Sequence, residues 1–358
     1  MTEGQKDYKA IIRPKIKLHE DINTTFNNIL GYKGIKDTMN LQIRKAKKNR
    51  PDTDKVPQFL FWGPPGTGKT ALVRAIAKES KNDLIMMDGS DFQGDGLKGG
   101  EVQLLEALFH VAYHEQREGH PFIIFIDECD LFLGKKDKNS AADKILAYCE
   151  SSQRGSSGPL DKFRPWLLLA TNFPWTLLPS VMSRVMPLEV SLPPDYETRA
   201  QIFLSQIISQ FGDDADGENK FKINIIFKDL ITLGVMSEDF SGRDIYKACD
   251  RAKILYNIDG APRTLYLETI DGIPFETNEA NAFLPPIPEK HIENNIGDNN
   301  STLNKLLQAN NVTINDIQKP ITVKYFIDAI NSPEVRGSVL RPEDKIQYEN
   351  YRKSTLGK

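Results

Sequence analysis

The eight residues GPPGTGKT, from Gly63 to Thr70, constrain this 358-residue chain more than any other feature. They follow the apolar run QFLFW and precede a helix-like run, and they fit the pattern G-x-x-x-x-G-K-[ST]. In such a loop the backbone N–H groups wrap phosphates, and the start of the following helix adds partial positive charge. Lys69 would reach the β- and γ-phosphates, and the Thr70 hydroxyl would bind Mg²⁺. The motif therefore predicts a nucleoside triphosphate site.

Five short apolar runs of strand length are separated by helix-like or loop segments. They are QFLFW, DLIMMD, PFIIFID, WLLLAT and PLEVSL. Strands that alternate with helices indicate a parallel sheet with helices on both faces. The predicted fold class is therefore α/β, a parallel sheet flanked by helices around the phosphate-binding loop.

The pattern changes near residue 195, after which the segments have helical spacing. We expect a mobile polar segment at 1–23, an α/β nucleotide-binding domain at 24–194 and a small helical lid domain at 195–358. Within the lid, a Pro- and Asn-rich stretch at about 259–300 predicts an insertion, and about 342–355 predicts a C-terminal helix.

Composition and charge exclude several classes of protein. The formal net charge of −3 gives no overall attraction to nucleic acid or to an anionic membrane. The three cysteines form no C-x-x-C motif, which argues against a disulfide framework or a zinc knuckle. No run approaches the roughly 18 apolar residues of a membrane helix, and the first residues lack the apolar stretch of a signal peptide. We therefore expect a cytoplasmic protein without a membrane segment.

Polar residues follow the later strands. The run FIIFID ends in Asp127, and Glu128 follows it. A carboxylate at a strand's carboxyl end can hold the Mg²⁺ shell, and the next one can orient a water for attack on the γ-phosphate. Asn172 ends the fourth strand, where it can hold the water or the γ-phosphate, and Arg184 can stabilise transition-state charge. The plainer alternatives are an Asn that closes a strand and a surface Arg.

Together with SGRDI in the helical part, the motifs GPPGTGKT, IDECD and ATNFP resemble the AAA+ ATPases, and within them the AAA proteins proper. The resemblance covers roughly residues 24–256 and resumes near 320. It implies a homo-oligomeric ring, commonly a hexamer, with ATP and Mg²⁺ bound between subunits. The C-terminal run LRPEDKIQYENYRKSTLG resembles the last helix of the Vps4, katanin and spastin clade and of the second ring of p97.

The resemblance also implies a role for each motif. Asn172 would be sensor 1, and Arg184 would be an arginine finger that acts in the neighbouring subunit. Many AAA proteins have two arginines in the finger region, where this chain has only Arg184. Backbone near Ile29 and Gly31 would meet adenine. The full nucleotide-binding set is Gly63, Pro64, Pro65, Gly66, Thr67, Gly68, Lys69, Thr70, Ala71, Asp127, Ile29, Gly31, Gly242 and Arg243.

The stretch GDGLKGG, residues 94–100, also fits G-x-G-x-x-G, the pattern of a dinucleotide site. It follows the second strand, however, whereas the first strand–helix unit already carries the phosphate-binding loop. In AAA proteins this place holds pore loop 1, which usually carries an aromatic residue. Here the tip has Leu97 and Lys98. The position implies a pore loop with a weaker grip, and a flexible loop without grip is the alternative.

These observations predict an ATP-hydrolysing ring motor that remodels, unfolds or disassembles a protein substrate, through a central pore. Two alternatives stay open: a clamp-loader-like ATPase that acts on nucleic acid, and an ATP-dependent scaffold without threading. The absence of a strongly basic domain and the form of the C-terminal helix disfavour nucleic acid.

Overall fold

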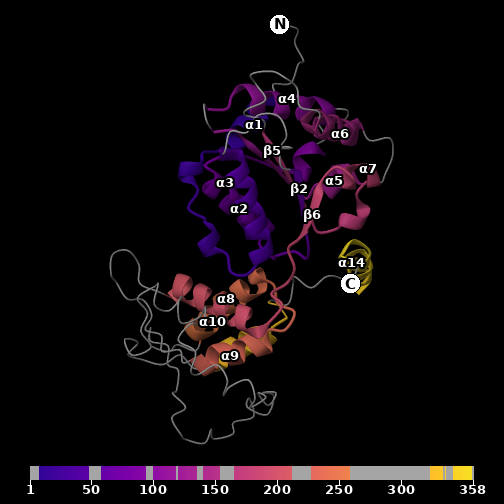
Figure 1. The fold of residues 1–358 in the computed structure, drawn as a ribbon. Coiled ribbons are helices and arrows are strands. Elements are labelled where there is room, and N and C mark those ends of the chain that lie inside the picture. The colour runs from indigo at the N-terminus through magenta and orange to yellow at the C-terminus, as the bar shows by residue number, and fades with distance from the viewer. Residues whose placement is uncertain are drawn as a thin grey trace, which may run out of the picture. The chain divides into compact units, whose positions relative to one another are not determined.

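The structure is a computed structural model. It describes residues 8–47, 58–93, 100–117, 120–134, 140–153, 165–211, 227–258, 323–333, 335 and 342–356. The contacts divide the chain into two compact units, of which the first is Met1–Ser191 with Leu340–Lys358 and the second is Leu192–Val339. The first unit is α/β and the second is helical (Figure 1).

The first unit is built on a six-stranded sheet with the order β1-β3-β4-β5-β2-β6. Five strands are parallel, and β1 pairs antiparallel with β3 at one edge. All five expected strands are present, which confirms the predicted α/β fold. The strands are β1 (Ile16–Lys17), β2 (Gln58–Trp62), β3 (Leu84–Asp88), β4 (Ile123–Asp127), β5 (Trp166–Thr171) and β6 (Met186–Glu189).

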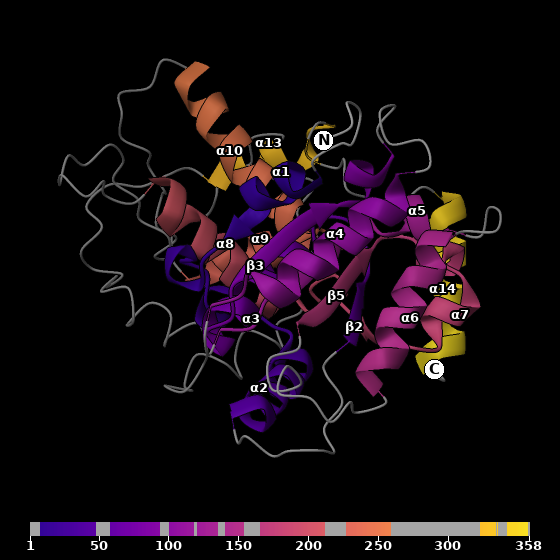
Figure 2. The same ribbon diagram turned by 90° about the horizontal axis from the view of Figure 1, so that it is seen from above.

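Helices cover both faces of this sheet (Figure 2). The α-helices of the unit are α1 (Tyr8–Ile12), α2 (Lys33–Lys47), α3 (Lys69–Ser80), α4 (Glu101–His114), α5 (Asp130–Leu133), α6 (Ser140–Gln153), α7 (Pro179–Met182) and α14 (Pro342–Leu356). Short 3-10 turns are η1 (Arg13–Lys15), η2 (His19–Asp21), η3 (Phe26–Asn28), η4 (Gly89–Phe92) and η7 (Pro174–Thr176).

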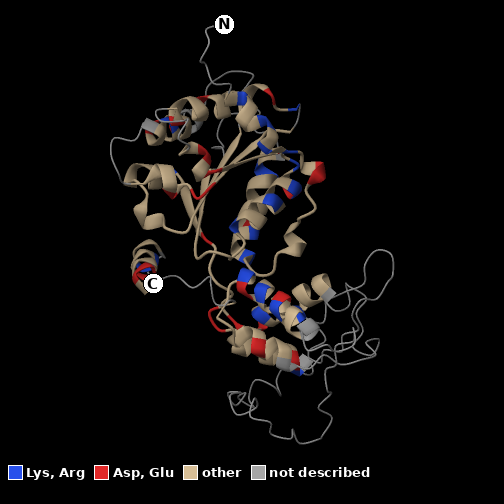
Figure 3. Ribbon diagram, turned by 180° about the vertical axis from the view of Figure 1, so that it is seen from behind, with Lys and Arg blue, Asp and Glu red and all other residues tan. Residues whose placement is uncertain are grey.

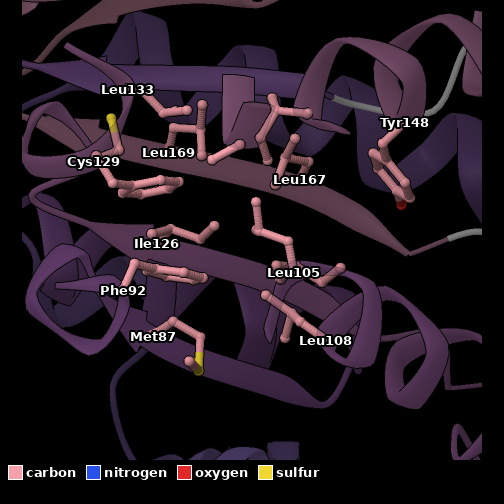
Figure 4. Packing of buried hydrophobic residues seen from close by; sticks show 14 of the residues in the cluster. Met87, Phe92, Leu105, Leu108, Ile126, Cys129, Leu133, Tyr148, Leu167 and Leu169 are labelled. Atoms are coloured by element: carbon pink, nitrogen blue, oxygen red, sulfur yellow. The ribbon is translucent and has the colours of Figure 1, made fainter. Parts of the chain in front are cut away.

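The apolar side chains of the central strands form two cores, one on each face of the sheet, because successive side chains of a strand point to opposite faces. Ile126 of β4 packs with Leu105 and Leu108 of α4 in one core (Figure 4). Phe125 packs with residues of α2 and α3, including Ile76, in the other. The strands are almost free of charged residues, which lie mainly on the helices and loops (Figure 3). The carboxyl ends of the parallel strands are therefore held by apolar packing on both sides.

The expectation of a mobile segment at 1–23 is wrong from Tyr8 onward. Helix α1 packs against α4, and its Ile12 is fully buried in the core shared with that helix. Strand β1 then adds an edge to the sheet. The polar composition of this segment concealed single apolar anchors such as Ile12 and Ile22. A two-residue strand also carries no readable alternation.

In its described residues, the second unit has helices where the sequence shows helical spacing. They are α8 (Tyr196–Phe211), α9 (Phe227–Met236), α10 (Gly242–Ile258) and α13 (Val323–Asn331). Phe203, Leu233, Ala248 and Phe326, one from each helix, share its core. This unit begins at Leu192 rather than at residue 195. The expected insertion at 259–300 lies outside the described residues.

The C-terminal helix belongs to the first unit and not, as the sequence analysis placed it, to the helical lid. Its Tyr351 ring lies edge-on to Trp62 with centroids 5.0 Å apart. Its Tyr348 hydroxyl donates to Glu189 Oε1 at 2.5 Å, and Arg352 forms an ion pair with the same carboxylate at 3.0 Å. Trp62 and Glu189 are register partners at the ends of β2 and β6. The helix therefore docks at the strand end that leads into the phosphate-binding loop.

Candidate nucleotide-binding and hydrolysis site

The phosphate-binding loop connects β2 to α3, and its backbone requires glycine at both ends. Gly63 has φ of 153°, and a Cβ there would lie 2.2 Å from the carbonyl oxygen of Val190. Gly68 is the N-cap of α3 with φ of 96°, in the left-handed region that L side chains rarely adopt. The helix start thus presents backbone N–H groups without a side-chain cap, which suits an anionic ligand.

Lys69 is held inside this loop and is only 7% exposed. Its ammonium donates to the carbonyl oxygens of Gly63 at 2.8 Å and Pro64 at 2.9 Å, and to Asn172 Oδ1 at 2.6 Å. A buried ammonium needs such oxygen partners, because an unpaired buried charge is strongly unfavourable. Phosphate oxygens would meet the same requirement. The structure therefore brings two predicted site residues, Lys69 and Asn172, into direct contact.

Thr70 and Asp127 also meet, as a shared metal site requires. The Thr70 hydroxyl donates to Asp127 Oδ2 at 2.6 Å. Hydroxyl and carboxylate oxygens are hard ligands of the kind that Mg²⁺ prefers. The donor set present at this point therefore fits a magnesium ion.

Glu128 lies in a cluster of carboxylates at the ends of β3 and β4, where Asp88 and Asp127 are register partners. Burial raises the pKa of Glu128, and the neighbouring Asp88, Asp127 and Asp130 raise it further. Its backbone has φ of +48°, a strained conformation of the kind found at functional sites. A carboxylate with a raised pKa accepts a proton more readily, which suits a general base.

The turn after β5 holds Asn172 through residues that lie outside the predicted site. The Thr171 hydroxyl donates to Asp130 Oδ1 at 2.5 Å and accepts the backbone N–H of Phe173 at 2.9 Å. Burial and the nearby Asp127 raise the pKa of Asp130, while its bond from Thr171 lowers it. The last residue of DECD, Asp130, was the available signal for this contact.

Arg184 lies just beyond α7, apart from the contacts that surround Lys69. Its guanidinium donates to Ser183 Oγ and to Glu150 of α6, each at 3.1 Å, and its side chain is 38% exposed. Within the described part of the chain, these partners do not belong to the Lys69 cluster.

The remaining predicted residues fall into three groups. Ile29 and Gly31 lie in the turn before α2, where the Ile29 carbonyl accepts from the Lys36 ammonium. Gly242 and the exposed Arg243 begin α10 in the second unit. Leu97 and Lys98 lie outside the described residues, as does most of GDGLKGG. The turn before α2 also contains Tyr32, a residue that no sequence motif marks.

The loop, the paired carboxylates and Asn172 at adjacent strand ends form the arrangement expected of a P-loop ATPase site. Residues 59–191 match the family described as "ATPase family associated with various cellular activities (AAA)". These residues thus match an AAA ATPase domain, which agrees with the motifs. Among the described residues, none of the helices has the length and apolar character needed to cross a membrane.

Two curated relatives illustrate the similarity. The proteasome-activating nucleotidase of Saccharolobus islandicus is 29% identical over 273 residues, which are 72% of this chain and 64% of that protein. Spastin of Drosophila willistoni is 33% identical over 190 residues, which are 52% of this chain and 22% of that protein. The chain thus spans less than two thirds of the length of these relatives.

Two solved structures share the fold. The AAA domain of FIGL-1 in complex with ADP has a TM-score of 0.62 at 20% identity and covers 99% of both chains. A structure on katanin self-assembly has a TM-score of 0.59 at 19% identity and covers 98% of both chains. The expected resemblance to AAA proteins of the katanin and spastin kind is confirmed.

Proposed function

We propose that this ATPase works as a homo-oligomeric ring that uses ATP hydrolysis to remodel, unfold or disassemble a protein substrate. The observation that carries the proposal is the contact of Lys69 with Asn172 at 2.6 Å, beside the contact of Thr70 with Asp127 at 2.6 Å. Those two pairs bring an ammonium, an amide and a carboxylate together at one edge of the sheet, which supports a site for a nucleotide and its metal ion. The relatives spastin and proteasome-activating nucleotidase support the choice of a protein substrate.

In this proposal each residue acts on ATP in a defined way. Lys69 and the backbone of residues 63–71 hold the phosphates, and Thr70 and Asp127 would hold Mg²⁺, which would supply positive charge to neutralise the phosphates. Glu128 orients and deprotonates the attacking water, and Asn172 holds the γ-phosphate from the side of β5. Backbone near Ile29 and Gly31 receives the adenine.

The proposal places the site at a boundary between subunits, in a ring that is commonly a hexamer. The exposed guanidinium of Arg184 would complete the site of a neighbour, and Arg243 would report on the γ-phosphate from the second unit. The katanin structure, which concerns self-assembly, supports an oligomer by analogy of fold. The proposed compartment is the cytoplasm.

The test is a substrate trap with the full chain. Glu128→Gln should retain ATP while hydrolysis falls by about a hundredfold or more, because a general base is removed without loss of the phosphate contacts. The variant is purified with ATP from a native lysate, and the co-eluting molecules are compared with those retained by Lys69→Ala. A specific protein on Glu128→Gln alone supports the proposal.

Other outcomes of the trap would redirect the proposal. Nucleic acid that nuclease removes would favour a clamp-loader-like ATPase, and an assembled ring without any bound molecule would favour a scaffold. Hydrolysis at the wild-type rate in Glu128→Gln would show that the catalytic assignment is wrong.

The proposed route of the substrate is a central pore lined by Leu97 and Lys98. An acidic side chain at Leu97 would remove the proposed apolar grip on the substrate, and Leu97 is not one of the proposed nucleotide-binding residues. Leu97→Asp should therefore spare basal ATPase activity and abolish remodelling of the trapped protein. Unchanged remodelling would exclude this loop from the mechanism.

A further inference from the structure

Tyr32 connects three segments that are far apart in the sequence. Its hydroxyl lies 2.7 Å from the carbonyl oxygen of Thr67 and 2.8 Å from that of Ser191. A phenol has one proton, so it donates to both carbonyls in a three-centre arrangement. Thr67 belongs to the phosphate-binding loop, and Ser191 is the last residue before the chain enters the second unit. One side chain therefore joins the loop to the exit of the first unit.

The backbone at Tyr32 argues that this contact is not incidental. Its φ is +54°, a left-handed conformation in which a bulky residue is unfavourable and Gly or Asn is preferred. The preceding turn is fixed by the Lys36 ammonium on the Ile29 carbonyl, and the Lys36 N–H bonds the Tyr32 carbonyl at 3.0 Å. Burial of the Tyr32 hydroxyl raises its pKa, so it remains a donor. The strained backbone is thus held by contacts that aim the phenol at the two carbonyls.

The residues that follow β6 also contact the start of the phosphate-binding loop. The Val190 N–H donates to the Trp62 carbonyl at 2.8 Å, and the Val190 carbonyl approaches Gly63 too closely for any Cβ. Val190 therefore contacts the start of the loop directly. Ser191 is linked to Thr67 through the Tyr32 hydroxyl, which bonds to both carbonyls. A displacement of either segment must be accommodated by the other, because packed interiors transmit strain.

We propose that Tyr32 is a positioning residue that couples the occupancy of the phosphate-binding loop to the segment in which the chain passes from the first unit to the second. Phosphate binding orders the loop at Thr67, and the phenol carries that order to Ser191. The inference rests on the proposed binding of ATP at the loop. It goes beyond that binding, because it names Tyr32 as the side chain that transmits nucleotide binding to the start of the second unit.

The experiment is amide hydrogen exchange on the full chain, with and without a non-hydrolysable ATP analogue. In the wild type, the analogue should slow exchange both in residues 63–72 and in residues 189–196. Tyr32→Phe keeps the ring and removes the hydroxyl. The variant should retain protection of the loop. At residues 189–196, however, its nucleotide-dependent protection should be about fivefold smaller than in the wild type, the factor expected for one ordinary hydrogen bond. Tyr246→Phe, at an exposed tyrosine of α10, is the matched control.

The outcomes separate this inference from the proposed function. A merely structural role of Tyr32 would change exchange without nucleotide and leave the nucleotide-dependent difference intact, which would overturn the coupling. Should Tyr32→Phe fail to fold, the wild type alone decides: protection of 63–72 without protection of 189–196 overturns the inference and leaves ATP binding in place. Protection of neither segment overturns both.

Discussion

The hydroxyl of Thr171 lies 2.5 Å from Oδ1 of Asp130 and accepts the backbone N–H of Phe173 at 2.9 Å. In the sequence, Asn172 lies between Thr171 and Phe173, and its Oδ1 accepts a hydrogen bond from the Lys69 ammonium at 2.6 Å. Thr171 is almost fully buried, so this arrangement has little freedom to shift. The carboxylate that begins α5 therefore fixes the turn that presents Asn172 to the phosphate-binding loop.

Removal of the Thr171 hydroxyl should thus impair turnover more than binding. Thr171→Val keeps the shape of the side chain but removes both hydrogen bonds of the hydroxyl, to Asp130 and from Phe173. We expect kcat for ATP hydrolysis to fall by about tenfold, which corresponds to about 1.4 kcal/mol of lost alignment. The dissociation constant of ATP should change by less than about threefold, because Asn172 is not the main phosphate ligand. Steady-state kinetics and ATP titration measure the two quantities.

Thr171→Ser is the matched control, because it retains the hydroxyl and loses only a methyl group. It should turn over ATP close to the wild-type rate. Equal kcat values for the serine and valine variants would show that Asp130 does not act through this hydroxyl.

Arg184 should act on the site of a neighbouring subunit. Its partners within the chain, Ser183 and Glu150, are not part of the Lys69 cluster. Arg184→Ala should lower ATPase activity by about a thousandfold, the effect of a lost arginine finger, and Lys69→Ala should be inactive through loss of phosphate binding. When the two variants are mixed before assembly, activity should reappear, since each Arg184→Ala site with an intact Lys69 can face a neighbour that still carries Arg184.

The measurement is the ATPase rate of the mixture against the sum of the separate rates. Glu150→Gln serves as the control for the contact within the chain and should behave like the wild type. Strict additivity of the two inactive variants would contradict action across the interface.

Local sequence patterns predicted the parts of this site that lie close in sequence. GPPGTGKT specifies its own backbone, because Gly63 and Gly68 adopt conformations that other residues avoid. Apolar runs of five to seven residues identified the parallel strands, whose carboxyl ends must meet at one edge. The motif and the parallel strands therefore predict that four residues lie close together, namely Lys69, Thr70, Asp127 and Asn172.

Contacts between distant segments were not predictable in this way. Tyr32 bonds to Thr67 and Ser191, and no local pattern marks a tyrosine as the donor to two remote carbonyls. The C-terminal helix was assigned to the wrong unit, since sequence order placed it after the lid whereas its aromatic residues pack on Trp62. Single buried residues such as Ile12 likewise carry no periodicity.

The cysteines should be chemically inert in the folded protein. Cys129, Cys149 and Cys249 are all buried, and burial raises the pKa of Cys149 to about 12 and the pKa of the other two as well. The thiolate is the reactive form, so near pH 8 alkylation should be negligible until the chain is denatured. Thiol titration with and without denaturant measures this, and ATPase activity should survive treatment with N-ethylmaleimide. Rapid modification of Cys129, which follows Glu128, with loss of activity would contradict the prediction.

Asp83 stabilises the edge of the sheet away from the nucleotide residues. It is fully buried just before β3, and its carboxylate accepts from Arg117 Nε and Nη2, each at 2.7 Å, and from the His19 backbone N–H at 3.0 Å. Burial pushes the pKa of Asp83 upward, but the bonds from Arg117 and His19 outweigh it and hold the pKa below the ordinary 3.8. The charged form is therefore favoured by folding.

Asp83→Asn should lower the free energy of unfolding by about 1–3 kcal/mol at pH 7, because charge-assisted hydrogen bonds to a buried carboxylate are lost. A group whose pKa is lower in the folded state stabilises the fold at pH values above its unfolded-state pKa. This stabilisation is lost as the pH falls through the folded-state pKa. The difference between wild type and variant should thus be the same at pH 7 and pH 5 and shrink below about 3.8. Urea unfolding at each pH measures it, with Asp37→Asn on the exposed face of α2 as the control. A difference that grows as the pH falls would show that the Asp83 carboxylate is not stabilised by Arg117 and His19.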